Sequence, residues 1–313
     1  MVQKVSRIVV IVGPTAVGKT AVGVLVARWF DGEIISADSR QIYRGMEIGT
    51  GAPSQLELDQ IRHHLVSVID PDQRLSAGEF ARMARTAVDD VNRRGKTPII
   101  VGGSGLYIRA LIDGLSPIPQ SDPEIRRRVE EEIEQRGMSE MNAELARVDP
   151  EYAVKVDIHD RKRLVRALEV WRKTGRSFTD WHSREPNRWC QPIFFGLSRP
   201  RDELHRIIEE RVGQMLEFGW LDELQELIDR YGLEGLPLSV TEAIGYRNLL
   251  TYIGGETDVK KDVVERIIIA TRQFAKRQMT WFRADPRIQW REESGSDAVQ
   301  KWAEWIGGIV KVI

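Results

Sequence analysis

The stretch IVVIVGPTAVGKT, residues 8–20, decides the fold of this chain of 313 residues. Its first five residues are all β-branched and are followed by a glycine and a proline, which is typical of a strand buried on both faces. After Lys19, the apolar residues follow the spacing of one helix face: Val22, Leu25, Val26 and Trp29. The stretch therefore predicts a strand, a tight loop and a helix in direct succession.

The tight loop, GPTAVGKT, matches the pattern G-x-x-x-x-G-K-[ST] of phosphate-binding loops. In such a loop, backbone N–H groups and the start of the following helix converge on phosphate oxygens. The lysine neutralises the phosphates and the last hydroxyl holds Mg²⁺, so we expect Mg²⁺ as a cofactor. The residues expected to bind a diphosphate or triphosphate are Gly13, Pro14, Thr15, Ala16, Val17, Gly18, Lys19 and Thr20, with Thr20 as the magnesium ligand.

Further strands and helices alternate along the chain. GEIISAD, which ends at Asp38, and TPIIVGGSG, which starts at Thr97, read as buried strands, and a helical pattern covers about 81–94. IFFGL at 193–197 adds a strand, and a long helical segment runs over about 260–283. This alternation predicts an α/β fold, a three-layer, P-loop NTPase-like core around a mostly parallel sheet.

The composition changes near Pro117-Ile118-Pro119, after which amphipathic helical patterns replace strands. One pattern is RRRVEEEIEQRG, which stops at Gly137, and another is RKRLVRALEVWRKTG, which stops at Gly175. We therefore expect the sheet core to be interrupted by an inserted all-helical domain, with the segments 1–118, 119–191 and 192–313.

The overall composition restricts the class of protein. Apolar residues make up 42% and charged residues 30%, and the net charge is −1, so contacts with nucleic acid must come from local clusters of Lys and Arg. The one cysteine, Cys190, excludes an internal disulfide and a multi-cysteine zinc site. No apolar run reaches the roughly 20 residues of a membrane span. We expect a cytoplasmic, monomeric protein that does not contact a membrane.

Asp38 is a candidate catalytic residue because it follows a predicted strand. Parallel sheets bind their ligands at this end of the strands, and a carboxylate there can accept a proton from a nucleophile opposite the phosphates. The alternative is a structural role as a helix N-cap. Gln41, which can recognise an amide or a base edge, favours the functional role.

Several segments together resemble the bacterial tRNA dimethylallyltransferase (tRNA isopentenyltransferase) family, and they occur in the family's order. They are GPTAVGKT (13–20), ADSRQIYRGMEIGT (37–50), HHLVSVIDP (63–71), VGGSGLYIRAL (101–111), RKRLVRALEVWRKTG (161–175), AIGYR (243–247) and AKRQMTWFR (275–283). The stretches around DSRQ and KRQMTWFR are the most specific, whereas many unrelated proteins share the phosphate-binding loop.

The resemblance implies the substrates. The loop would bind dimethylallyl diphosphate rather than ATP, which agrees with the glycines that stand where TPIIV would otherwise end in an acidic residue. The acceptor would be N6 of adenosine 37, next to the anticodon, in tRNAs that read codons starting with U. The protein would therefore bind the anticodon stem-loop of tRNA.

The resemblance also implies roles for individual residues. Asp38 would be the general base, Ser104 would position the amine and the diphosphate, and Arg211 would clamp the diphosphate. Ser104 stands where most relatives have threonine, and either hydroxyl can serve. The residues implied to contact tRNA are Asp38, Ser39, Arg40, Gln41, Ser104, Arg126, Lys162, Arg163, Leu164, Val165, Arg166, Glu242, Ala243, Ile244, Gly245, Tyr246 and Arg247.

Charge in the inserted segment is divided between its halves. Residues 119–154 carry 5 basic and 10 acidic residues, and 155–190 carry 10 basic and 5 acidic residues. The second half is expected to present a basic face at Lys162, Arg166 and Lys173, which either binds RNA or is merely solvated.

Three other functions remain open on the residues alone. A small-molecule P-loop kinase would use Asp38 to activate a hydroxyl, with the insertion as a lid. An isopentenyltransferase could act on free AMP instead of tRNA. A non-catalytic RNA-binding module is disfavoured, because Lys19, Thr20 and Asp38 are needed for chemistry rather than shape.

Overall fold

The computed structural model describes residues 7–116, 118–182, 189–255 and 260–312. The chain divides into two compact units, Met1–Ile112 with Trp189–Ile313, and Asp113–Arg188. The division falls at 112/113 and 188/189, where the sequence had suggested 118/119 and 191/192. Pro117, part of the change in composition used for that boundary, lies outside the described residues.

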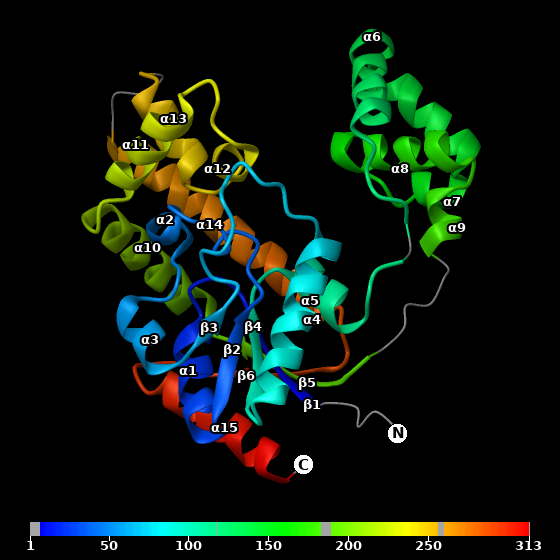
Figure 1. Ribbon diagram of the computed structural model, residues 1–313. Coiled ribbons are helices and arrows are strands. Elements are labelled where there is room, and N and C mark those ends of the chain that lie inside the picture. The colour runs from blue at the N-terminus through cyan, green and yellow to red at the C-terminus, as the bar shows by residue number, and fades with distance from the viewer. Residues whose placement is uncertain (1–6, 117, 183–188, 256–259, 313) are drawn as a thin grey trace. The chain divides into compact units, whose positions relative to one another are not determined.

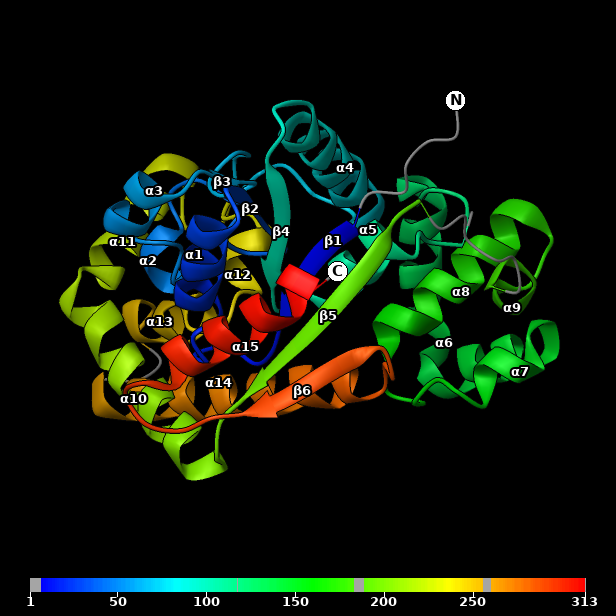
Figure 2. The same cartoon turned by 90° about the horizontal axis from the view of Figure 1, so that it is seen from below.

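The first unit is built on a sheet of six parallel strands in the order β3-β2-β4-β1-β5-β6 (Figures 1 and 2). The strands are β1 (Arg7–Val12), β2 (Gly32–Ser36), β3 (His63–His64), β4 (Thr97–Gly102), β5 (Gln191–Ser198) and β6 (Ile288–Glu292). The predicted parallel α/β core is confirmed. The two edge strands were not predicted, because one has two residues and the other is only partly buried and has no run of apolar residues.

Helices cover both faces of the sheet. α4 (Ala77–Arg93) and α5 (Gly105–Ile112) contact each other on one face, and α1 (Lys19–Trp29) contacts α15 (Ala298–Val312) on the other. Alternate residues of β1 enter two different cores, since Val10 and Val12 belong to the first and Val9 and Ile11 to the second. Burial on both faces explains the unbroken β-branched run that the sequence shows.

The remaining elements of this unit are helical. α10 packs on α14, and α11 packs on α2 and α13. These helices are α2 (Glu47–Thr50), α3 (Gln55–Gln60), α10 (Arg201–Glu217), α11 (Trp220–Tyr231), α12 (Leu238–Thr241), α13 (Tyr246–Ile253) and α14 (Lys260–Arg283). The predicted long helix over 260–283 is confirmed.

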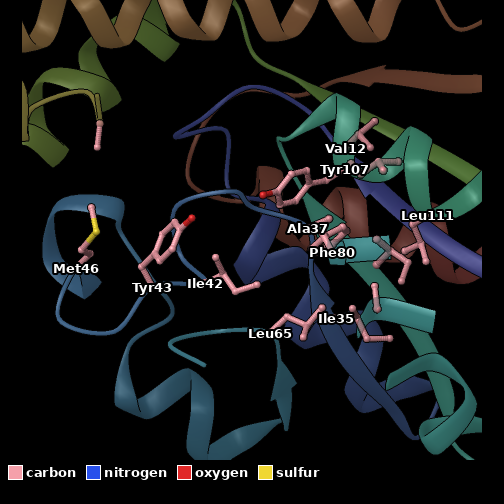
Figure 3. Close-up of a cluster of buried hydrophobic side chains, with 14 of the residues drawn as sticks. Val12, Ile35, Ala37, Ile42, Tyr43, Met46, Leu65, Phe80, Tyr107 and Leu111 are labelled. Carbon is pink, nitrogen blue, oxygen red and sulfur yellow. The ribbon is translucent and has the colours of Figure 1, made fainter. Parts of the chain in front are cut away.

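The core anchors the loop that follows β2. Figure 3 shows Ile42, Tyr43 and Met46 on this loop, and all three side chains are buried. On the other side, Ala37 is also buried, so residues 38–41 are fixed at both ends. A short polar segment between two buried anchors has little freedom to move, which suits residues that must hold a set geometry.

In the part that the structure describes, the second unit contains helices and no strand: α6 (Pro123–Val148), α7 (Pro150–Ala153), α8 (Arg161–Thr174) and α9 (Phe178–His182). Gly137 interrupts α6 with a φ of 80°, and Gly175 ends α8 in the left-handed region, as the sequence predicts. One face of α8 packs in the core of this unit through Leu164 and Leu168.

None of the helices in the described residues combines the length and the apolar character needed to span a bilayer.

Candidate active site

The phosphate-binding loop joins β1 to α1 in the predicted order. Gly13 lies so close to β5 that an added Cβ would be 2.6 Å from the carbonyl oxygen of Leu197, and it has a φ of +154°. Gly18 is the N-cap of α1, and no side chain caps this helix. The ammonium of Lys19 donates to the carbonyl of Pro14 at 2.7 Å. The uncapped amides at the start of α1 can therefore bind an anion, with Lys19 beside them.

Two distant side chains hold this loop. The amide oxygen of Gln278, on α14, accepts a hydrogen bond from the N–H of Thr15 at 2.7 Å. On the other side, Nε of Arg199 donates to the carbonyl of Val17 at 3.1 Å, and its guanidinium lies over the ring of Trp302. The sequence analysis missed both residues; the only signal for Gln278 was its place in KRQMTWFR.

A cavity of about 710 Å³ opens along the loop. It brings together five of the residues predicted to act on the donor or the acceptor: Lys19, Thr20, Asp38, Gln41 and Arg211. Among the described residues, no three His, Cys, Asp or Glu side chains cluster as ligands for a metal ion. A magnesium ion here would therefore have to take most of its ligands from substrate oxygens and water, as Mg²⁺ commonly does.

The carboxylate of Asp38 combines the two roles considered for it. Its Oδ1 accepts hydrogen bonds from the backbone N–H of Arg40 at 2.9 Å and of Gln41 at 3.3 Å, which holds the turn. Its Oδ2 has no hydrogen-bond partner within the described ranges. Ser104 fixes the same turn, because its Oγ accepts from the N–H of Ser39 at 2.9 Å. One oxygen is thus structural, and the other is free to accept a proton.

The backbone carbonyl of Gly51 holds two of the predicted site residues. It accepts hydrogen bonds from Nη2 of Arg211 at 3.0 Å and from Nε2 of Gln41 at 2.9 Å. Gly51 is the left-handed C-cap of α2 with a φ of 58°, and a Cβ there would lie 1.7 Å from Nη2 of Arg211. A glycine is therefore required for Arg211 to reach this position.

Burial lowers the pKa of Lys19 to about 8, while the nearby Asp38 carboxylate opposes this shift and the Arg211 guanidinium adds to it. Burial also lowers the pKa of Arg211, although a guanidinium stays protonated at neutral pH. Lys19 and Arg211 both lie beside Asp38 in this cavity, and each cation could pair with an anionic oxygen of a diphosphate.

A second cavity of about 360 Å³ adjoins the first. Both are lined by Asp38 and Arg211, whereas the second alone is lined by Ser39, Arg40, Trp220, Glu242, Phe274 and Arg277. The guanidinium of Arg40 donates to the carbonyl of Ser239 at 2.7 Å and so ties its turn to α12. Asp38 therefore lies where a ligand in one cavity would meet a ligand in the other.

A buried carboxylate that the sequence analysis missed supports this second cavity. Glu223 accepts from the N–H groups of Ile48 at 2.7 Å and Gly49 at 2.9 Å, and from the hydroxyl of Tyr246 at 2.5 Å. Burial raises the pKa of Glu223. The ring of Trp220 packs edge to face against the ring of Tyr246, with 5.5 Å between the two ring centroids.

The residues of the stretch 242–247, which the family resemblance implies to contact tRNA, differ in their burial. Tyr246 and Ala243 are buried, at 0% and 2% exposure, and an added Cβ at Gly245 would lie 1.9 Å from the ring of Trp220. These three residues pack inside the first unit, where Ala243 and Tyr246 also form part of the wall of the second cavity. Arg247 and Glu242 are exposed and Ile244 is half-buried, and Glu242 and Ile244 line the second cavity.

In the second unit, the residues implied to contact tRNA also divide by helix face. Leu164 and Val165 are buried at 0% and 1% exposure, so their side chains are part of the core and cannot contact RNA. Lys162 and Arg163 are exposed at the start of α8. Arg126 lies on α6, and its Nε pairs with Glu130 at 3.0 Å.

Two of the three cations expected to form a basic face, Arg166 and Lys173, have partners within this unit, whereas the whole set of Lys162, Arg166 and Lys173 stays a prediction as an RNA-binding face. Arg166 donates to the carbonyl of Pro119 and pairs with the buried Glu169 at 3.0 Å. Lys173 donates to the carbonyl of Gln120 at 3.1 Å. Arg166 and Lys173 therefore bind the segment that leads into α6, because its backbone carbonyls need donors.

Comparisons with known proteins cover both units. Residues 41–285 match the IPP transferase family. The chain is 43% identical over 288 residues to tRNA dimethylallyltransferase 2 of Geotalea uraniireducens (strain Rf4), covering 91% of this chain and 92% of the relative. It is 42% identical over 285 residues to the tRNA dimethylallyltransferase of Heliobacterium modesticaldum, covering 90% and 88%.

Solved structures agree with these relatives. The tRNA isopentenylpyrophosphate transferase of Bacillus halodurans has a TM-score of 0.69 at 33% identity, with 97% of each chain covered. A eukaryotic dimethylallyltransferase that acts on tRNA has a TM-score of 0.83 at 26% identity, covering 98% of this chain and 80% of that one.

Gly51→Ala should weaken the binding of inorganic diphosphate by roughly tenfold or more, because its Cβ displaces Arg211 and a charge-assisted contact is lost. Calorimetry measures the affinity. Gly95→Ala is the matched control, since Gly95 has a φ of +73° and no atom within 4 Å of its added Cβ. Equal affinities in the two variants would show that Arg211 does not bind the diphosphate.

Proposed function

This chain belongs to the IPP transferase family, and from that membership we propose how its two adjoining cavities perform the reaction. The protein is a transferase that moves a dimethylallyl group from its diphosphate to tRNA. We propose that the first cavity binds dimethylallyl diphosphate, and that the second receives adenosine 37 of the anticodon loop, whose N6 is the acceptor.

The observation that carries this proposal is the place of Asp38 and Arg211 on both cavities, with Lys19 on the first cavity alone. A donor in the first cavity and a base in the second would meet at this carboxylate. Its Oδ2 would accept the proton of N6 as the new C–N bond forms.

The weak nucleophile explains the need for fixed cations. The exocyclic amine of adenine is a poor nucleophile, because its lone pair is delocalised into the ring. Attack becomes feasible when cleavage of the C–O bond runs ahead and negative charge gathers on the leaving diphosphate. Lys19, Arg211 and the amides at the start of α1 would stabilise that charge more in the transition state than in the ground state.

Magnesium fits the donor side of this arrangement. The hydroxyl of Thr20 lines the same cavity as Lys19 and would hold Mg²⁺ together with diphosphate oxygens and water. The bound ion would add positive charge beside the leaving group.

The acceptor base must leave its stack to reach a cavity of this kind. Ser39, Arg40 and Gln41 stand on the turn next to Asp38, which places polar groups around the incoming base. We propose that this turn recognises the adenine, in tRNAs that read codons starting with U. A phosphate-transferring kinase and transfer to free AMP are set aside, because the relatives named above act on tRNA.

The direct test offers the protein unmodified tRNA and Mg²⁺ with either dimethylallyl diphosphate or ATP, followed by mass spectrometry of the nucleosides. Only the first donor should yield a prenylated adenosine. Asp38→Asn should retain the binding of tRNA and diphosphate but lower kcat by roughly 10²–10⁴-fold, the usual effect of losing a general base. Turnover within a few-fold of the wild type would remove Asp38 from that role.

The pKa of Lys19 predicts the pH dependence of donor use. Lys19 is charged below its pKa of about 8, so kcat/KM for the donor should fall as the pH rises through that value. The bound diphosphate stabilises the ammonium, so kcat at saturating donor should fall only at higher pH. Lys19→Arg keeps its charge across this range and should give a flat profile. If kcat/KM of the wild type stays constant from about pH 7 to about 9, Lys19 does not lose its proton in that range.

We propose that the exposed cations of α8 bind the RNA backbone. Replacing Lys162 and Arg163 by alanine should weaken tRNA binding for every tRNA sequence and reduce its salt dependence, by a slope of roughly 0.7 per lost single-strand contact. Replacing Arg128 and Arg147, also exposed cations of this unit, is the control and should change neither. If the two double variants bind tRNA alike at every salt concentration, the start of α8 does not contact tRNA.

A further inference from the structure

We propose that Gln278 is a positioning residue that fixes the diphosphate-binding loop and the turn of Asp38 relative to each other. The inference rests on the proposed reaction, because it concerns the alignment of the donor in one cavity with the acceptor in the next. So far Gln278 has been described only as one of the two side chains that hold the diphosphate-binding loop.

The side-chain amide of Gln278 bonds to two different loops. It lies on α14 with an exposure of 6%. Its Oε1 accepts from the N–H of Thr15 at 2.7 Å, and its Nε2 donates to the carbonyl of Gly103 at 3.0 Å. Only one orientation of the amide satisfies both bonds, since a backbone N–H needs an acceptor and a carbonyl needs a donor. A carboxylate could not donate to the carbonyl of Gly103, and an ammonium could not accept from the N–H of Thr15. The amide of a glutamine can make both bonds.

The bond to Gly103 continues to the catalytic turn. Ser104, the next residue, donates its backbone N–H to the carbonyl of Ala37 at 3.2 Å and accepts the N–H of Ser39 on its hydroxyl at 2.9 Å. Asp38 lies between these two partners. Hydrogen bonds, together with the peptide link from Gly103 to Ser104, therefore connect the diphosphate-binding loop through Gln278 to the backbone on either side of Asp38.

The glycines of the β4–α5 turn are shaped for this contact. An added Cβ at Gly103 would lie 2.3 Å from Nε2 of Gln278. At Gly105, it would lie 2.1 Å from the ring of Trp281, one helical turn further along α14. Two side chains of the same face of α14 therefore rest directly on the backbone of this turn.

Alignment between loops affects catalysis more than binding. The attacking nitrogen and the allylic carbon must approach to roughly 3–3.5 Å, and a displacement of about 1 Å can lower the rate about 10²-fold. Since Thr15 gives its N–H to Gln278, the clamp uses an amide that is then not available to a phosphate. Loss of the clamp should therefore lower kcat while changing substrate affinity little.

The test compares three variants. Gln278→Met keeps the length and packing of the side chain but removes both hydrogen bonds. Gln278→Glu keeps an acceptor for Thr15 and places a carboxylate oxygen against the carbonyl of Gly103. Gln273→Met is the control, because Gln273 lies on the same helix and is exposed.

Steady-state kinetics with tRNA and dimethylallyl diphosphate should show a fall in kcat of roughly 10²-fold for Gln278→Met, with both KM values within a few-fold of the wild type. Gln278→Glu should also lose kcat, and Gln273→Met should match the wild type. Hydrogen exchange gives a readout without catalysis. The amides of the 13–18 segment should exchange faster in Gln278→Met but stay protected in Gln278→Glu, which still accepts from Thr15.

Unchanged exchange in Gln278→Met, or a kcat within about threefold of the wild type in both Gln278 variants, would overturn the proposal. So would a loss of activity that follows only the fraction of folded protein. If Gln278→Met does not fold, Gln278→Glu decides by its kcat alone. A wild-type protein that prenylates no tRNA would instead contradict the proposed reaction, and the exchange measurement would still test the clamp.

Discussion

The parallel direction of β1, β4 and β2 is the constraint on which the site depends. Because these strands run the same way, their carboxyl ends lie at one edge, and the loops after all three must share that space. β4 lies between the other two, so its end has the least room. An added Cβ at Gly102 would be 2.2 Å from the carbonyl oxygen of Ala37. An acidic residue like that of many ATP-using relatives of this fold cannot stand there, because the turn that carries Asp38 fills the place.

Both site cations rest on backbone carbonyls in the structure, Lys19 on Pro14 and Arg211 on Gly51. A neutral carbonyl satisfies a buried cation without cancelling its charge, so each cation keeps its attraction for an anion. Diphosphate can then replace one acceptor by a stronger one without rebuilding the site. The same carbonyl of Gly51 also accepts a hydrogen bond from Gln41, so one backbone group holds both Arg211 and a residue of the turn that carries Asp38.

Local patterns predicted the central strands, the phosphate-binding loop and the gathering of Lys19, Thr20 and Asp38 at one edge, because strand direction alone brings those residues together. Residues that act across the fold were missed. Gln278 bonds to a loop that lies 263 positions earlier, and no periodicity reports such a contact. The family resemblance implied tRNA contacts for whole segments of sequence. A helix, however, turns some residues toward the core and others toward solvent, so Leu164 is buried while Lys162 is exposed. The edge strand β6 gave no signal, since it lacks the apolar run of the central strands.

The two cavities adjoin along a shared wall that includes Asp38 and Arg211, and this arrangement bears on the kinetic order of the proposed reaction. If donor and acceptor occupy the two cavities as proposed, neither has to enter through the space of the other. On the proposed assignment, released inorganic diphosphate would compete with fresh donor for Lys19, which lines the first cavity alone. Product inhibition by diphosphate would then be competitive toward the donor. The leaving group could depart from the first cavity while the modified RNA still occupies the second.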